Sequence, residues 1–99
     1  MLIKHMKYYI VYILTNKKHG TLYTGITSNF ITRILQHKEG IYGGFSKKYA
    51  LNKLVYYEIF TDIHYAIARE KQLKRWRRDW KIELIEKDNP DWEDLYPGL

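Results

Sequence analysis

Runs of apolar residues along the chain predict three β-strands. Two aromatic-rich runs within residues 8–25 flank the polar stretch 15–20. Runs of β-branched and aromatic residues on either side of such a stretch are typical of a β-hairpin. A third run of similar composition, residues 53–60, predicts one more strand. The pattern therefore favours a small three-stranded sheet.

Apolar residues at helical spacing predict a helix between the second and third strands. In residues 30–39 they recur on one face, after an N-cap at Ser28 or Asn29, and Gly40 follows the last turn. Residues 40–52 are rich in glycine and lysine, and we interpret them as a loop.

A longer helix is expected from about His64 to Asp79, with Asp62 as its N-cap. On a helical wheel, one broad face carries Tyr65, Ala66, Leu73, Trp76 and Trp80, which we assign to the core. A short apolar piece at residues 82–85 predicts a final helical segment, and a turn is expected at residues 89–90.

Together these elements predict an α/β fold with the order strand, strand, helix, strand, helix, helix. We expect a small single domain over residues 1–99, in which helices flank a largely antiparallel sheet, with a loose N-terminus at residues 1–7. Charged residues make up 28% and hydrophobic residues 45% of the chain, as is usual for a soluble globular protein.

Composition excludes several classes of site and location. The chain has no cysteine, so disulfides and thiolate zinc sites are absent. Residues 1–7 hold only the apolar pair Leu2–Ile3, which is too short for a signal peptide or a membrane span. We therefore expect a cytoplasmic protein with no membrane partner.

The net charge of +6 is concentrated in residues 69–81, where seven basic residues meet two acidic ones. Such an excess suits nucleic acid or an anionic membrane surface, although many soluble proteins are moderately basic. The candidate phosphate contacts on the long helix are Lys71, Lys74, Arg75 and Arg78. In the loop, Ser46, Lys47 and Lys48 either contact phosphates or form a solvated turn.

Two tyrosines of the hairpin are candidates for chemistry. If Leu14 pairs with Thr21, then Tyr12 lies opposite Tyr23 and both hydroxyls project from one face of the sheet. The alternative is that both are ordinary strand residues, since the chain has ten tyrosines.

Three further residues have the right chemistry at suggestive positions. Arg33 and His37 are four apart on the first helix and lie at the rim of its apolar stripe, where they either border a cleft or have no role. Glu70 falls beside the apolar side of the long helix. Its carboxylate either pairs with an arginine such as Arg33 or binds a hard divalent cation.

Arranged in this order, these residues resemble the GIY-YIG endonuclease superfamily, specifically its short stand-alone bacterial members. Residues 10–12 match the first signature and residues 23–25 the second, with ten residues between the tyrosines. The first signature lacks its glycine and has valine for isoleucine, while the second has threonine in the middle. Both tyrosines and Gly25 are retained.

The resemblance extends to the later site residues. Arg33 and His37 match the arginine of the family and the histidine one turn later, and Glu70 matches its metal-binding glutamate. Asn89 is the loosest match, to an asparagine found late in the family. Gly25 and Asn89 are thereby expected to support the active site.

The resemblance implies a metal-dependent DNA endonuclease that hydrolyses phosphodiester bonds with one Mg²⁺ or Mn²⁺ held by Glu70. By this resemblance, Arg33 is expected to bind the phosphate. Tyr12 is expected to act on the attacking water, as its general base or as the group that orients it. Tyr23 and His37 are expected to have supporting roles. DNA is the expected partner, without a small-molecule cofactor, and structure-selective action in DNA repair or recombination is a further implication.

Two other functions stay open at the level of sequence. The chain carries no separate recognition domain, which leaves room for a nucleic-acid-binding module of the same fold with little or no catalytic activity. The third is a protein-interaction domain whose basic helix meets an acidic partner. The sequence does not identify protein partners.

Overall fold

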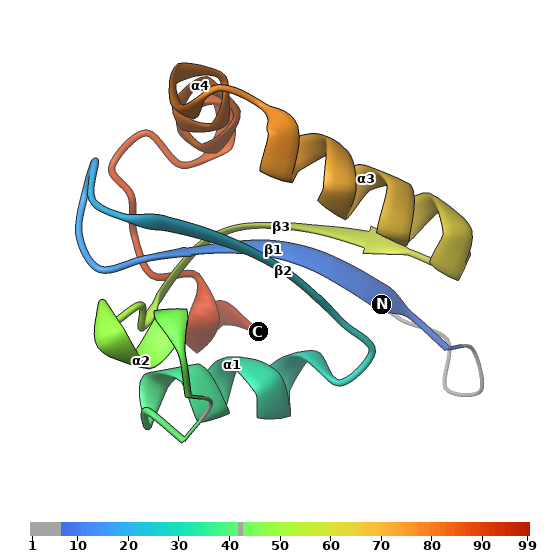
Figure 1. Ribbon diagram of the computed structural model, residues 1–99, viewed down its shortest axis with the longest axis horizontal. Coiled ribbons are helices and arrows are strands. Elements are labelled where there is room, and N and C mark those ends of the chain that lie inside the picture. The colour runs from blue at the N-terminus through green and yellow to red at the C-terminus, as the bar shows by residue number, and fades with distance from the viewer. Residues whose placement is uncertain (1–6, 42) are drawn as a thin grey trace.

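The computed structural model describes residues 7–41 and 43–99, which form a three-stranded antiparallel sheet with helices on both faces (Figure 1). The elements in chain order are β1 (Tyr9–Thr15), β2 (Leu22–Thr27), α1 (Phe30–Lys38), α2 (Phe45–Lys48), β3 (Lys53–Phe60), α3 (Ile63–Arg75), α4 (Arg78–Asp88) and a 3₁₀ turn (Tyr96–Gly98). The predicted fold class is confirmed. A loose N-terminus was expected at residues 1–7, and all of these except Lys7 lie outside the described residues.

Strand β1 lies at the centre of the sheet, in the order β2-β1-β3, and its residues from Ile10 onward are buried. Successive strand residues point to opposite faces. Tyr12 and its neighbours two residues away pack toward α1, whereas Val11 packs toward α3. Figure 1 shows α3 and α4 over one face, with α1, α2 and the C-terminal turn beneath the other. Both faces of β1 are therefore covered.

The register of the hairpin differs from the prediction by two residues. Tyr12 pairs with Gly25 and Leu14 pairs with Tyr23, instead of Tyr12 with Tyr23. A shift of two residues preserves the face of every side chain, so the two tyrosines still share one side of the sheet as diagonal neighbours. The connection between the strands is residues 16–21, which has the same length as the predicted stretch 15–20 and begins one residue later.

The long helix expected from His64 to Asp79 is two helices. Trp76 and Arg77 have extended backbone between α3 and α4. From the first turn of α4, Arg78 Nη2 donates to the carbonyl oxygens of His19 and Gly20, each at 2.6 Å. This clamp joins α4 to the hairpin connection, directly after a break that has no glycine or proline.

The break also changes the predicted core. Trp76 is half-buried and packs against the Val11 cluster. Trp80 belongs to α4 and is 44% exposed, and Tyr65 at the start of α3 is 70% exposed. Both were assigned to the core because the wheel assumed one continuous helix packed along its full length.

The C-terminal tail closes the exposed side of β3. Leu95 N donates to Leu54 O at 2.8 Å, and Leu54 N donates to Asp94 Oδ1 at 3.1 Å. Trp92 is fully buried, as expected for a closing segment. The loop predicted at residues 40–52 contains the short helix α2. In the described ranges, no helix is long and apolar enough to cross a membrane.

We predict that Thr24→Val stabilises the fold. Within residues 7–41 and 43–99, the buried Thr24 Oγ1 has no hydrogen-bond partner, and valine removes this hydroxyl at nearly constant volume. The free energy of unfolding should rise by about 1 kcal/mol, which corresponds to roughly 4–8 °C in Tm for a domain of this size. Thermal unfolding followed by circular dichroism measures the change.

The matched control is Thr15→Val on the same sheet. Thr15 is fully buried, but its hydroxyl donates to Lys17 O at 2.8 Å, so valine should lower Tm instead. An unchanged or lower Tm for Thr24→Val would contradict the assignment.

Candidate functional site

Three aromatic side chains from β1, β2 and α1 meet on one face of the sheet. The ring centroids of Tyr12 and Tyr23 lie 6.4 Å apart, and the imidazole of His37 lies 5.8 Å from the first and 5.5 Å from the second. Residues separated by up to 25 positions thus form one cluster, here called the tyrosine–histidine cluster.

Gly25 makes room for this cluster. A Cβ atom built on Gly25 would lie 2.5 Å from both Cζ and Oη of Tyr12, closer than real Cβ contacts allow. The Tyr12 phenol therefore occupies the space above its cross-strand partner. Any side chain at position 25 would displace the phenol, which gives the glycine of the second signature a direct steric reason.

A buried hydrogen-bond chain passes through His37. Tyr12 Oη lies 3.0 Å from His37 Nε2, and His37 Nδ1 lies 2.5 Å from Ser46 Oγ. All three side chains are at most 3% exposed. Both ring nitrogens therefore have a hydroxyl partner, which fixes the orientation of the imidazole.

The charge state of His37 is set by its surroundings. Burial, followed by the positive charge of Arg33, lowers the pKa of His37 to about 4. The imidazole is therefore neutral near pH 7, with one nitrogen donating and the other accepting. When Nδ1–H donates to Ser46, Nε2 accepts from the Tyr12 phenol. The opposite tautomer reverses both bonds.

The part of this site that reaches solvent is formed by other residues. Tyr23 and Arg33 are half-buried, whereas Tyr12 and His37 are covered. Arg33 lies on α1 one turn before His37 and acts on it electrostatically, and the Tyr23 ring adjoins the same imidazole. A ligand arriving from solvent would meet the Tyr23 phenol and the Arg33 guanidinium first.

Glu70 occupies a different layer of the molecule. It lies on α3, which covers the opposite face of the sheet from α1 (Figure 1). Its side chain is 13% exposed, and Oε2 pairs with Lys74 Nζ at 2.7 Å. The Glu70 carboxylate is thus paired with a lysine of its own helix, and its role as a metal ligand stays a prediction.

The residues present fit a divalent ion only in a limited way. Among the described residues, no group of three or more histidine, aspartate or glutamate side chains is arranged to hold a metal. Glu70 therefore offers one carboxylate. Magnesium commonly uses one or two carboxylates, with substrate phosphate oxygens and water completing its shell. Such an ion would depend on bound substrate.

Asn89 has structural hydrogen bonds. At the end of α4, its Nδ2 donates to Val55 O at 3.1 Å and to Glu93 O at 2.9 Å, and its Oδ1 accepts from Glu93 N at 2.9 Å. These bonds hold the start of the tail against β3. Its expected support of the active site stays a prediction.

The candidate phosphate contacts fall into two groups. Lys47, Lys48, Lys71 and Arg75 have exposed side chains on α2 and α3. Lys74 is paired with Glu70, and Arg78 already donates to backbone carbonyls of the hairpin connection. Ser46 is buried against His37, so a phosphate contact from this serine does not fit the structure.

Sequence reasoning missed two partners. Ser46 was predicted to contact a phosphate or to lie in a solvated turn, because nothing in its spacing points to His37. Arg69, which had no role, clamps Glu58 on β3 through Nε and Nη2 at 2.9–3.1 Å. An acidic residue on the α3-facing side of a strand was the available signal for this pair.

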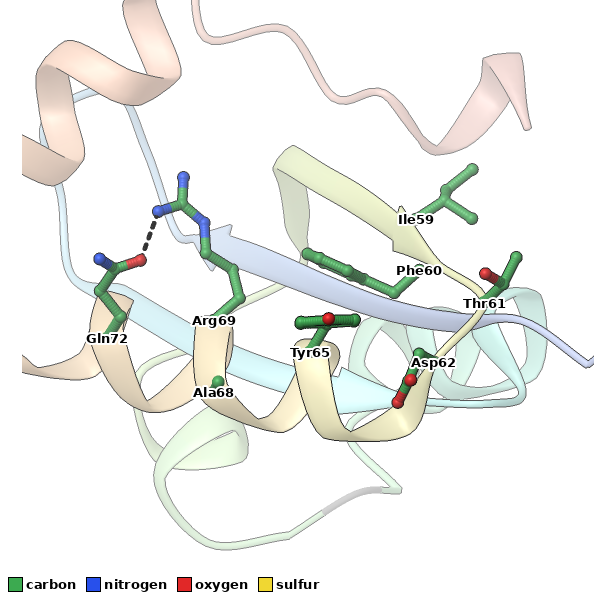
Figure 2. A pocket seen from close by; sticks show the side chains of 8 residues that line it. All are labelled: Ile59, Phe60, Thr61, Asp62, Tyr65, Ala68, Arg69 and Gln72. Atoms are coloured by element: carbon green, nitrogen blue, oxygen red, sulfur yellow. Dashed lines mark hydrogen bonds between the residues drawn. The ribbon is translucent and has the colours of Figure 1, made fainter.

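A groove elsewhere on the molecule carries no comparable set of groups. It lies between the end of β3 and α3, and Figure 2 shows its side chains: Ile59, Phe60, Thr61, Asp62, Tyr65, Ala68, Arg69 and Gln72. Its charged groups are already used, since Arg69 binds Glu58 and Gln72, and Asp62 caps α3. We assign no chemistry to it.

Comparisons with known proteins identify the family of this chain. The family model described as the GIY-YIG catalytic domain matches residues 8–83. A UPF0213 protein of Syntrophus aciditrophicus is 39% identical over 82% of this chain and 92% of its own length. One of Staphylococcus haemolyticus is 36% identical over 82% of this chain and 98% of its own length.

A solved structure has the same fold. The solution NMR structure of a UPF0213 protein from Bacillus halodurans superposes with a TM-score of 0.56 and 27% identity, and it covers 89% of this chain and 93% of that one. The family match spans both tyrosines, Arg33, His37 and Glu70. The chain therefore belongs to the GIY-YIG family, a family of nuclease domains.

Proposed function

We propose that this protein is a metal-dependent DNA endonuclease that hydrolyses phosphodiester bonds at the tyrosine–histidine cluster. The observation that carries the proposal is the meeting of Tyr12, Tyr23 and His37 on one face, beside the charge of Arg33. The family match supports a nuclease. Phosphodiester hydrolysis needs an oriented water and stabilisation of charge on the phosphate.

Arg33 is the group suited to the phosphate. Its guanidinium is permanently charged and forked, so it can donate two hydrogen bonds to non-bridging oxygens. Tyr23 is the half-buried member of the cluster, and its hydroxyl can orient either the water or the phosphate. Both act from the solvent-facing side of His37.

Beneath them, the buried chain orients the Tyr12 phenol. Tyrosine has an ordinary pKa of about 10 and needs nearby positive charge to act as a base near pH 7. A neutral His37 with Nε2 as acceptor holds the phenol through the 3.0 Å hydrogen bond, but its own pKa of about 4 makes it too weak a base to take the phenol proton. Ser46 favours this tautomer when its oxygen accepts from Nδ1–H.

Glu70 is the proposed ligand for one Mg²⁺ or Mn²⁺. When bound, such an ion polarises the phosphate and lowers the pKa of coordinated water. Glu70 would hold it through one carboxylate and would exchange Lys74 for the ion. Affinity for metal without DNA should therefore be weak.

Two observations favour the alternative of a DNA-binding module with little catalysis. The Glu70 carboxylate is already neutralised by Lys74, and the Tyr12 hydroxyl is covered. Salt-sensitive DNA binding without Mg²⁺-dependent nicking would identify this function.

Arg33→Ala should lower the rate of DNA cleavage by roughly 10²–10³, the usual effect of removing one group that stabilises transition-state charge. Glu70→Ala should abolish metal-dependent cleavage without unfolding the protein. Branched, nicked and duplex DNA, each incubated with Mg²⁺ and with chelator, provide the measurement. Glu83→Ala, an exposed carboxylate on α4, is the matched control and should cut like the parent. Parental rates for both site variants would refute the assignment.

The neutral His37 predicts a pH dependence of stability. The unfolded chain binds a proton at His37 near its ordinary pKa of 6.5, whereas the folded chain does so only near 4. Acid therefore favours the unfolded state, and Tm should fall as the pH decreases from 6.5 to 4. The NMR titration of His37 should show its midpoint near pH 4, and Arg33→Ala should raise it, because a nearby positive charge is removed. A midpoint near 6.5 in the parent protein would exclude a buried neutral imidazole.

A further inference from the structure

An aromatic surface extends outward from the tyrosine–histidine cluster. The Phe45 ring stacks on Tyr23 with centroids 6.2 Å apart and planes 26° from parallel, and Tyr49 follows at 4.7 Å from Phe45. Phe45 is 47% and Tyr49 is 39% exposed. We call these two residues of α2 and its C-cap the aromatic platform.

The platform is built into the candidate site. Ser46, the residue after Phe45, lies 2.5 Å from His37 Nδ1 and so fixes α2 beside the cluster. The turn into α2 uses Gly44 at φ 73°, a conformation that favours glycine. The short helix thus buries its serine under the site and leaves its aromatic rings at the surface.

The segment that carries the platform has charge of one sign. Residues 40–57 contain Lys47, Lys48 and Lys53 and no acidic residue. The Lys48 Nζ atom lies 5.4 Å from the centroid of the Tyr49 ring, and the side chain of Lys47 is exposed on the same turn. Aromatic rings interleaved with lysines suit a base together with its flanking phosphates.

We propose that the aromatic platform binds an unpaired nucleobase next to the phosphate that Arg33 holds, so that the preferred substrate is DNA with unpaired nucleotides. In a duplex, the two faces of a base are covered by the neighbouring bases. Only an unpaired base can stack on a protein ring without disrupting the stacking of the duplex. This inference rests on the proposed function and names the substrate class of the same site.

Another exposed aromatic residue supplies a matched control. Trp80 on α4 is 44% exposed and has the Arg77 guanidinium 4.7 Å from its ring, so its chemistry resembles that of the platform. It lies on the helix layer that covers the opposite face of the sheet. Its removal tests whether any exposed ring beside a cation contributes to binding.

The experiment measures Kd by fluorescence anisotropy in chelator and low salt, for a duplex and for the same duplex with one unpaired 2-aminopurine. Phe45→Leu should weaken binding of the unpaired DNA by roughly 5- to 150-fold, the range for loss of one base stack, and change duplex binding by less than about twofold. Phe45→Trp should retain both affinities, and Trp80→Leu should alter neither. The 2-aminopurine fluorescence should be quenched by the parent and by Phe45→Trp, and less by Phe45→Leu.

Other outcomes separate the two proposals. Thermal unfolding first shows that Phe45→Leu and Tyr49→Leu are folded. If the parent binds DNA and these substitutions change binding of both DNAs equally or not at all, the platform is refuted and the endonuclease proposal stands. Competition by polyglutamate as effective as by the unpaired DNA would also refute it, because charge alone would then explain binding. If the parent binds neither DNA at low salt, both proposals fail.

Discussion

The ring of Tyr12 lies across Gly25, and the rest of the site depends on this contact. With the phenol in the place of a Cβ, the hairpin cannot slip without forcing another side chain against the ring. The fixed register then sets Tyr23 diagonally beside Tyr12 and presents the hydroxyl to His37. One missing side chain thus determines both the pairing of the strands and the geometry of the hydrogen-bond chain.

The sequence was sufficient for features that follow from periodicity. Alternation along the strands predicted the shared face of Tyr12 and Tyr23. That prediction held although the register was wrong by two residues, because a shift by an even number leaves each side chain on the same face. The position of the hairpin connection, one residue later than predicted, depends instead on backbone geometry. Likewise, the break at Trp76 has no glycine or proline to signal it, and the contact of Arg78 that follows it joins residues 58 positions apart. Long-range hydrogen bonds of this kind, such as that of Ser46 with His37, leave no periodic trace.

The residues proposed to act on the phosphate and the proposed metal ligand belong to layers on opposite faces of the sheet. The tyrosines, His37 and Arg33 belong to the layer of α1, whereas Glu70 belongs to α3 and is balanced by Lys74. Strand β1 packs against both layers, through Tyr12 toward α1 and through Val11 toward α3. Because Glu70 supplies one carboxylate, and the described residues hold no group of three or more ligand side chains, phosphate oxygens of the substrate and water would have to complete the shell of a bound ion. Binding of metal and substrate would then be thermodynamically linked.

The contact of Arg78 with His19 and Gly20 has a consequence for how this fold tolerates changes in length. A hairpin tip is usually the place where insertions are accepted. Here one guanidinium grips two consecutive carbonyls of that tip, so added residues would separate α4 from the sheet. By contrast, a Cβ built on Gly43 or Gly44 meets nothing within 4 Å. Lengthening should therefore be better tolerated ahead of α2, where the extra chain would also lie beside the aromatic platform.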